Sequence, residues 1–149
     1  MAAALVWAGV EARHVTPGAA AVGPLPSPPE PRAVESSLAR AQSLRAAGDS
    51  EGAVLFLRQR IAQGPYSGYA WFLLGELAYE AQAYPTAVTH YRKAVETDPS
   101  VGDREGAFAS GAVIADRLDT LLAGPWAQDR PPEVRDLYYL KRRLAGGCE

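Results

Sequence analysis

Apolar and small residues recur every three or four positions in the chain beyond Pro31, which is the spacing of one face of an α-helix. The clearest stretch predicts a helix over about 68–81 and a second helix that starts near Pro85, because proline suits the first helical position. Pro99 ends this second helix. Gly75 in the first helix lets a neighbouring helix approach closely, at some cost in helix propensity. The expected buried residues are Trp71, Leu74, Leu77 and Ala78 on the first helix and Ala87, Val88, Tyr91, Ala94 and Val95 on the second.

The same pattern occurs 34 residues earlier in the chain. The pairs that share this offset include Pro65 and Pro99, Ala53 and Ala87, Leu57 and Tyr91, Leu44 and Ala78, and Ala41 and Gly75. The earlier unit predicts helices over about 33–47 and 50–63, joined by a turn at Gly48-Asp49. The later unit has Gln82-Ala83 at the corresponding turn, where a left-handed residue costs about 1 kcal/mol more without glycine. The expected buried residues of the earlier unit are Leu38, Ala41, Leu44, Ala53, Val54, Leu57 and Ile61.

A third unit begins in the same register and then departs from it. The residues that continue the pattern are Phe108, Ala109 and Ala112. The stretch 106–124 then reads as one uninterrupted helix, with Phe108, Ala112, Ala115, Leu118 and Leu122 on one side. It ends at Gly124-Pro125, and Pro131-Pro132 open a final helix over about 133–144. These two helices are predicted to cover the exposed face of the preceding unit as a C-terminal cap.

A 34-residue unit of two helices, with small residues where the helices nearly touch, resembles the tetratricopeptide repeat (TPR) family. The resemblance is clearest over residues 70–99 and weaker over 34–66 and 103–115. It implies an all-α fold, a short TPR-like α-solenoid of stacked antiparallel helix pairs with a C-terminal capping pair. A Pro/Ala-rich extended arm precedes it.

The domain organisation expected from this pattern has two parts. Residues 1–33 form an apolar N-terminal arm and a proline-rich linker, and residues 34–149 form the TPR-like helical domain. The domain divides into units 34–66 and 67–100 and a divergent third unit with its cap, 103–149.

The N-terminal segment leaves two interpretations open. Residues 2–10 are apolar or small, but a membrane-spanning helix needs roughly 20 such residues, and no Lys or Arg precedes them as in a signal peptide. They are either the end of a signal-anchor whose beginning is missing from this sequence or a short apolar segment that docks on the body or on a partner. The prolines within 17–31 predict an extended linker, and Pro26 with Pro29 leaves open a proline-rich ligand for an aromatic-lined groove.

The charge distribution argues against several kinds of partner. The formal net charge is −2 at pH 7, and no segment carries the one-signed field that attracts nucleic acid. The short basic run 141–143 is best explained as a favourable end of the last helix. Cys148 is the single cysteine and cannot form an internal disulfide. A tail cysteine with no role and an intermolecular disulfide both remain open for it.

Residues with the chemistry of catalysis or metal binding do not form a recognisable set. His14 lies in the proline-rich third and His90 is expected on the outer face of a repeat helix. Glu76 and Glu80 are one helical turn apart but no histidine joins them, so a solvated helix face is the expected arrangement. We therefore expect no enzyme, no metal, no cofactor and no small-molecule substrate.

The resemblance implies a concave groove lined by the first helix of each pair, which in the family binds extended peptides or a partner's helix. The positions that match the groove are Gln42, Arg45 and Ala46 in the first unit, Tyr69, Phe72, Leu73, Glu76, Tyr79 and Glu80 in the second, and Ser110, Val113 and Ile114 in the third. The predicted partner-binding residues are Arg45, Tyr69, Phe72, Glu76, Tyr79, Glu80 and Val113. The aromatic members give large contact area with a polar handle and are the expected hot spot. The alternative is that these aromatics pack on the N-terminal segment or on the last helix.

Two functions therefore remain open at this point. The resemblance implies a non-catalytic protein–protein interaction module, an adaptor or assembly factor that holds a peptide or helix of a partner in its groove. The alternative is a structural accessory subunit of a larger, membrane-associated complex, held by the N-terminal arm. The partner is expected to be a protein, and a cytoplasmic location is the default expectation. A membrane-anchored location is the alternative if residues 2–10 end a signal-anchor.

Overall fold

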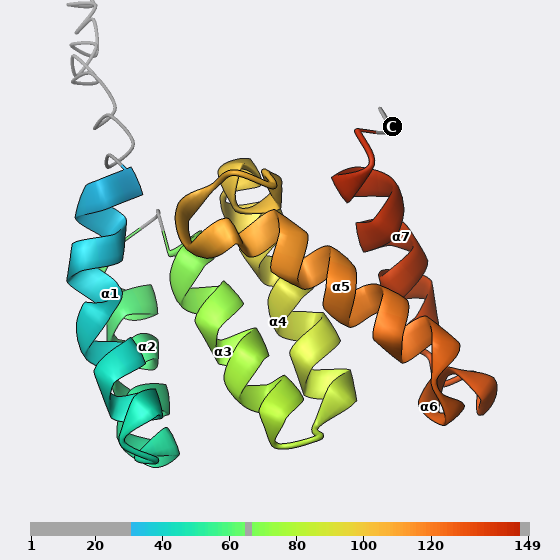
Figure 1. The fold of residues 1–149 in the computed structure, drawn as a ribbon, viewed down its shortest axis with the longest axis horizontal. Helices are drawn as coiled ribbons and strands as arrows, with labels where there is room; N and C mark the ends of the chain where they lie inside the picture. The colour runs from blue at the N-terminus through green and yellow to red at the C-terminus, as the bar shows by residue number, and fades with distance from the viewer. Residues whose placement is uncertain (1–30, 65–66, 147–149) are drawn as a thin grey trace, which may run out of the picture.

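The computed structural model describes residues 31–64 and 67–146, and they form a row of helices without a strand in these two ranges. Helix α1 (Pro31–Ala46) pairs with α2 (Ser50–Gln63), and α3 (Gly68–Glu80) pairs with α4 (Tyr84–Thr97). Figure 1 shows the two antiparallel pairs side by side, with α2 packed against α3. These four helices begin and end within a few residues of the positions that the sequence predicts.

The two hairpin turns have the same hydrogen-bond pattern 34 residues apart. In the first, the N–H of Asp49 donates to the carbonyl of Leu44 at 2.9 Å, and in the second, the N–H of Ala83 donates to Ala78 at 2.9 Å. This is the Schellman termination, which requires a left-handed residue after the helix. Gly48 takes that conformation with φ +80°, and Gln82 takes it with φ +57°. The second turn therefore has the left-handed residue without glycine that the sequence predicts.

Close packing between α3 and α4 depends on Gly75. A Cβ atom at this position would lie 2.4 Å from the ring of Tyr91, which is fully buried. The predicted buried stripe of α4 is confirmed, since Ala87, Val88, Tyr91, Ala94 and Val95 are all buried. On α3, Leu74 and Leu77 are buried, whereas Trp71 and Ala78 are half-buried. Small residues on one helix thus receive large ones from the next, as in a stacked helical repeat.

The third region departs from this regular stacking. After two short 3-10 turns, η1 (Pro99–Gly102) and η2 (Ala107–Ala109), helix α5 runs over Ser110–Ala123. The helix expected over 106–124 therefore begins four residues later, because Phe108 and Ala109 are left-handed with φ of +62° and +50°. This kink also turns the helix about its axis. Its buried side is Ser110, Gly111, Ile114, Leu118 and Leu121, whereas Ala112, expected to be buried, is exposed.

Two contacts fix α5 where it leaves the kink. The hydroxyl of Ser110 donates to the carbonyl of Val101 at 2.8 Å, and the N–H of Gly111 donates to Asp103 at 3.2 Å. A Cβ atom on Gly111 would lie 2.2 Å from the carbonyl oxygen of Gly102, so only glycine fits this approach. The start of α5 is therefore locked against η1.

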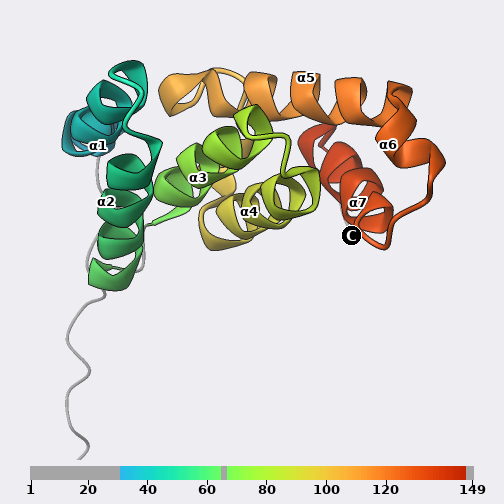
Figure 2. The same cartoon turned by 90° about the horizontal axis from the view of Figure 1, so that it is seen from below.

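The C-terminal helices complete the row. A short turn, α6 (Pro125–Gln128), leads to α7 (Val134–Leu144), which packs on α4 and α5 with Leu137 and Leu140 fully buried. Figure 2 shows α5 extending over α3 and α4 on the side where α1 lies, while α2, α4 and α7 lie on the opposite side. The described residues thus form an all-α stack of antiparallel helix pairs with a C-terminal cap, as predicted.

Two predictions concern residues beyond the described ranges. Residues 1–30 of the arm and linker expected over 1–33, and the C-terminal Cys148, lie outside the residues that the structure describes. The last three residues of that expected linker already belong to α1, which begins at Pro31. Within the described part of the chain, none of the helices has the length and apolar character needed to cross a membrane.

Candidate functional site

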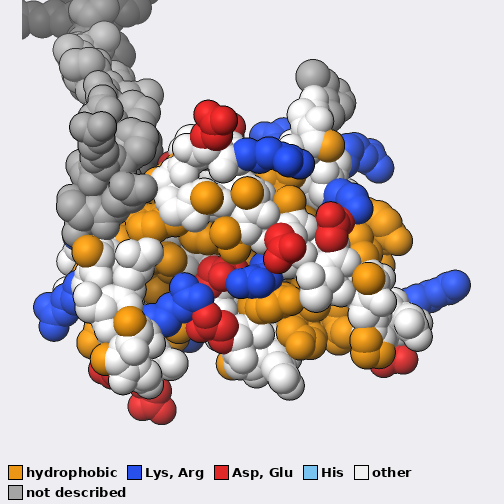
Figure 3. All heavy atoms as spheres, in the orientation of Figure 1, with side chains coloured by type: hydrophobic (Ala, Val, Ile, Leu, Met, Phe, Trp, Pro, Cys, Tyr) orange, Lys and Arg blue, Asp and Glu red, His pale blue; other side chains and the backbone are white. Residues whose placement is uncertain are grey.

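Side chains from α1, α3 and α5 meet on one side of the molecule, which we call the front face. It consists of Arg45, Glu76, Tyr79, Glu80, Val113 and Arg117. Figure 3 shows positively and negatively charged side chains gathered at the centre of this view, with hydrophobic side chains around them. Five of the six belong to the predicted partner-binding set, and the sixth, Arg117, does not.

Glu76 lies at the base of the front face and is almost fully buried, with 4% of its surface exposed. Its carboxylate accepts a hydrogen bond from the Tyr91 hydroxyl at 2.5 Å and another from Arg117 at 3.2 Å. The guanidinium of Arg45 lies 3.8 Å away. A buried carboxylate is stable only when its oxygens are paired, and here three side chains from three helices pair it. Glu76 therefore ties the front face to the core.

The Tyr91 hydroxyl is the innermost member of this network. Burial, and then the adjacent negative charge of Glu76, raises the pKa of Tyr91 far above its usual value of 10. The phenol consequently stays protonated and acts as a hydrogen-bond donor. The arrangement holds Glu76 in one orientation, which in turn orients both arginines.

The outer part of the front face is the ion pair between Arg45 and Glu80. The Nε atom of Arg45 donates to both carboxylate oxygens of Glu80, at 3.0 and 3.1 Å, and its terminal NH2 group contacts the same carboxylate. This hydrogen bond raises the pKa of Arg45, which remains charged. The two side chains are 31% and 45% exposed, so both can also contact a partner.

A row of aromatic rings continues from the front face toward the C-terminal cap. Arg117 lies over the ring of Tyr79 at 4.6 Å, Tyr79 lies 5.6 Å from Tyr84, and Tyr84 lies 6.0 Å from Trp126. All three rings are half-buried. They combine apolar area with polar atoms, the composition typical of protein-binding surfaces.

Arg117, Tyr84 and Trp126 were missed by reasoning from the sequence. Tyr84 precedes the proline that opens α4, and Trp126 lies in a short turn after α5, so neither belongs to a helical stripe. Arg117 lies on a helix whose rotation the sequence did not reveal. The signal that could have found Trp126 is a tryptophan directly after a helix stop, which lies outside the repeat pattern.

Two predicted hot-spot residues are not on the surface. Tyr69 and Phe72 are each 2% exposed, and Leu73 is also buried. They pack against Phe108, whose ring centroid lies 5.9 Å from that of Tyr69 and 6.5 Å from that of Phe72. The expectation that these two aromatics are open to a partner is therefore wrong for this conformation. They contact the η2 turn, which neither of the alternatives drawn from the sequence anticipated.

The groove positions of the third unit also need correction. Ser110 and Ile114 are fully buried because the kink at the start of α5 turns them toward the core. Val113 is half-buried and belongs to the front face, one helical turn before Arg117, while Gln42 and Ala46 on α1 are exposed. The predicted groove is thus divided into an accessible outer part and a part filled by the chain itself.

A second surface, the rear groove, lies between α2, α3 and α4. Its volume is about 470 Å³ and its apolar lining includes Val54, Leu55, Leu74, Leu77 and Ala78. Leu55 is 67% exposed, which is unusual for so large an apolar side chain in the described part of the chain. This surface was not anticipated from the sequence.

His90 lines the rear groove and is half-buried instead of lying on the outer face. Its ring lies 5.2 Å from Trp71, and its buried Nδ1 atom has no hydrogen-bond partner. Burial, together with the positive charges of Lys93 and Arg58, lowers the pKa of His90, so the ring is neutral at pH 7. No group of three potential metal ligands occurs in the ranges 31–64 and 67–146.

Comparison with known proteins assigns the class of this fold. A family model described as Tetratricopeptide repeat matches residues 34–77, which are most of α1, all of α2 and most of α3. This stretch of the chain is therefore similar to a tetratricopeptide repeat, and the resemblance drawn from the sequence is supported there. The match covers the unit with the weaker sequence pattern and reaches only the first helix of the clearer one.

Tetratricopeptide repeats generally mediate protein–protein interactions and are typically not catalytic. No curated protein and no solved structure matches the chain. The match thus indicates similarity to a family of interaction modules over residues 34–77, and it does not identify a partner.

Proposed function

We propose that this chain is a non-catalytic adaptor that binds a peptide or a helix of a protein partner on its front face. The observation that carries the proposal is the Arg45–Glu80 pair, which is the exposed end of a network whose inner members are buried. Its charges are held in place by Glu76, so a partner meets them already oriented. Such preorganisation lowers the entropy cost of binding.

The surroundings of the pair support the same role. Tyr79, Tyr84 and Trp126 offer half-buried rings beside it, and the tyrosine and tryptophan side chains dominate many protein interfaces. A partner with apolar side chains beside one charged group would match this surface. The charged group of the partner would either displace one member of the Arg45–Glu80 pair or pair with one of them in addition.

Site-specific photo-crosslinking tests the proposal in the organism that makes the protein. A photoreactive amino acid replaces Gln42 or Ala46, which are exposed on α1 beside Arg45, and Gln59, exposed on α2, serves as the matched control. We expect a discrete crosslinked protein from positions 42 and 46 and none from position 59. Mass spectrometry of the crosslinked band identifies the partner.

Affinity measurements with the identified partner give the second readout. Glu80→Arg places two like charges together on the front face and should weaken binding about tenfold or more, because a hot-spot charge is worth 1.4 kcal/mol or more. Gln59→Arg also adds positive charge, one unit where Glu80→Arg adds two, and should leave binding unchanged. Equal effects of the two variants would contradict a front-face site.

The same samples test the alternative of an accessory subunit held by its N-terminal arm. That function requires the chain to leave its assembly when residues 1–30 are deleted, while Glu80→Arg stays attached. Fractionation of the full chain and the deleted form then shows whether the association is with membranes.

A further inference from the structure

We infer that the rings of Tyr69 and Phe72 form a binding seat for an aromatic side chain of a partner, which the chain's own Phe108 occupies in this structure. The inference rests on the proposed function, since it assigns the inner part of the same binding side. It also specifies the partner, as a segment that carries an aromatic residue beside a basic one.

The contacts of Phe108 are those of a bound ligand side chain. Its ring is stacked on Phe72 with an interplanar angle of 22° and meets Tyr69 edge-on at 64°. Both receiving residues are on α3 at positions where the sequence predicts partner contacts. The η2 turn that carries Phe108 also lies against α1, so it bridges the two helices that line the predicted groove.

Phe108 is more exposed than the residues that receive it. It is half-buried, while Tyr69 and Phe72 are almost completely buried. Phe108 and Ala109 both adopt left-handed backbone conformations, with φ, ψ of 62°, 14° and 50°, 36°. Consecutive left-handed residues without glycine are unfavourable. Opening of this turn therefore relieves local backbone strain. A partner side chain can therefore replace Phe108 at a small net cost.

The turn is bounded by positions that can stay in place while it opens. On its C-terminal side, Gly111 is locked against the backbone of Gly102. Inside the turn, the N–H of Ala109 donates to the carbonyl of Gly106 at 2.9 Å, and this bond must break when Phe108 leaves. The amide of Ala109 therefore reports opening of the turn separately from unfolding of the helices.

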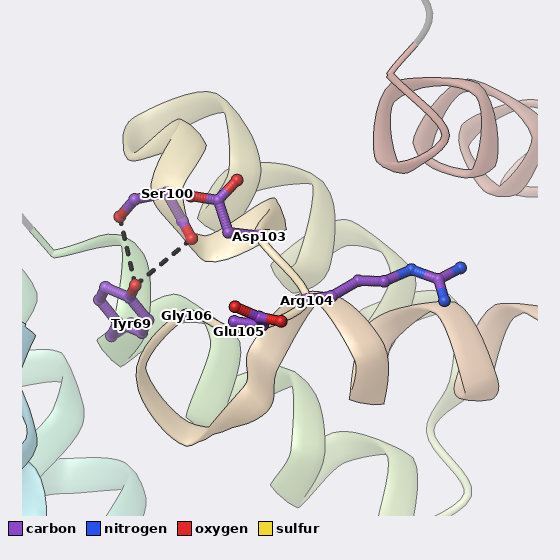
Figure 4. A pocket seen from close by; sticks show the side chains of 6 residues that line it. All are labelled: Tyr69, Ser100, Asp103, Arg104, Glu105 and Gly106. Carbon is purple, nitrogen blue, oxygen red and sulfur yellow. Dashed lines mark hydrogen bonds between the residues drawn. The ribbon is translucent and has the colours of Figure 1, made fainter.

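A hollow next to the seat indicates the chemistry of the partner. It has a volume of about 520 Å³ and is lined by Tyr69, Ser100, Asp103, Arg104, Glu105 and Gly106. Figure 4 shows the Tyr69 hydroxyl directed at Ser100, which it meets at 3.2 Å between hydroxyl oxygens, and Arg104 extending away from Tyr69. The carboxylates of Asp103 and Glu105 remain beside the hollow. A Lys or Arg next to the aromatic residue of the partner would therefore find negative charge.

Short peptides test the seat without knowledge of the natural partner. The probe is N-acetyl-Phe-Lys-amide, with N-acetyl-Ala-Lys-amide as the control for the aromatic ring and N-acetyl-Phe-Glu-amide as the control for the charge. Binding to the full chain is followed by NMR shifts of the Tyr69 and Phe72 rings. We expect Phe-Lys to bind more tightly than either control.

Two variants change the occupancy of the seat in opposite directions, and a third variant is the control. Phe108→Ala empties the seat and should strengthen binding of Phe-Lys about tenfold or more. Ala109→Gly removes part of the backbone strain of the closed turn and should weaken binding of Phe-Lys. Tyr138→Ala truncates an exposed aromatic residue on α7, outside both proposed binding surfaces, and should leave binding of Phe-Lys unchanged. Circular dichroism verifies that each variant is folded.

Hydrogen exchange in the wild-type chain distinguishes a displaceable turn from ordinary core packing. We expect the amide of Ala109 to exchange faster than those of Ala87 and Tyr91 in α4, and faster still with saturating Phe-Lys. The inference is overturned if the Ala109 amide exchanges only at the rate of global unfolding, or if Phe108→Ala gains no affinity for the probe. If Ala-Lys gains as much affinity as Phe-Lys, the seat is likewise refuted.

Failure of this inference leaves the proposed function separately testable. A partner that crosslinks from position 42 and binds Phe108→Ala and wild type equally uses the outer front face alone. Absence of crosslinking at position 42, with probe binding at the seat intact, would reject the outer site and retain the seat.

Discussion

The second helix pair and the third region carry the same repeat register but use it differently. Positions 48, 82 and 116 are spaced by one repeat each, and the first two are the left-handed residues that end α1 and α3. Asp116 at the third position lies inside α5, and the chain does not turn there. The same position of the repeat is therefore a turn in the first two units and the interior of a helix in the third.

The left-handed residues of the third region occur earlier, at Phe108 and Ala109. There the chain crosses from η1 to α5 and fills the space between α1 and α3 with an aromatic ring. In the second pair, by contrast, the strained residue lies in an exposed turn and the aromatic ring of Tyr91 fills a notch at Gly75. The comparison shows that similar small and large residues produce regular stacking in one region and a self-filled groove in the other.

The notch at Gly75 is the most sensitive point of the second pair. Gly75→Ala places a methyl group 2.4 Å from the Tyr91 ring, and the buried ring has little room to move. We expect a loss of about 3 kcal/mol in the free energy of unfolding, near the upper end for an overpacked core. Urea denaturation measures it. Gly64→Ala, where the added atom meets nothing within 4 Å, is the control and should change stability little.

The link between the two regions is Glu76. Glu76→Ala leaves Tyr91 and Arg117 without their shared acceptor and should cost about 2–3 kcal/mol. Glu76→Gln keeps a side-chain oxygen for Tyr91 and should cost less. If the two variants lose the same stability, then the negative charge, and not the hydrogen bond, joins α5 to α3. NMR of Arg117 shows whether α5 has shifted.

Alkaline pH tests the buried end of the same network. The pKa of Tyr91 is raised in the folded state, so the unfolded chain releases this proton near pH 10 while the folded chain retains it. Stability from this group is therefore complete below pH 10 and falls as pH rises, by about 1.4 kcal/mol per pH unit. Tyr91→Phe should lack this part of the slope in urea denaturation. Tyr138→Phe, at a tyrosine that is 58% exposed, should keep the wild-type slope.

Glycine substitution at the left-handed positions is expected to have the smallest effect, in the stabilising direction. Gln82→Gly and Ala109→Gly each remove a backbone penalty of about 1–2 kcal/mol, partly offset by the greater freedom of glycine in the unfolded chain. We expect a net gain of about 0.5–1 kcal/mol for each, measured as a rise in the melting temperature. A gain at 82 without one at 109 would show that the third region already relaxes its strain in solution.

The sequence predicted the first four helices closely because turn residues and apolar spacing agree there. The helix over 50–63 has the expected bounds, and the left-handed turn at Gln82 was anticipated from its place in the repeat. The prediction failed at 106–109, since no local signal marks Phe108 and Ala109 as left-handed. Contacts of α5 with η1 and α7 impose that conformation. A tertiary contact can override local helix preference in this way.

The candidate site was predicted only in its outer part. Arg45, Tyr79 and Glu80 lie where the repeat register placed them, because residues on one helix face keep their relative positions. Tyr69 and Phe72 were expected to be exposed and are covered by a segment whose path the register did not specify. Arg117 and Trp126 came to the site through the rotation of α5 and the turn that follows it.

Helix spacing, turn residues and the glycine notch, all readable along the chain, were thus enough to determine an all-α repeat of stacked hairpins. Only the folded structure decided which face of α5 is buried and which groove residues are covered. The physical reason is that helix periodicity is a local property, whereas the rotation and placement of a helix depend on distant surfaces that bury its apolar side.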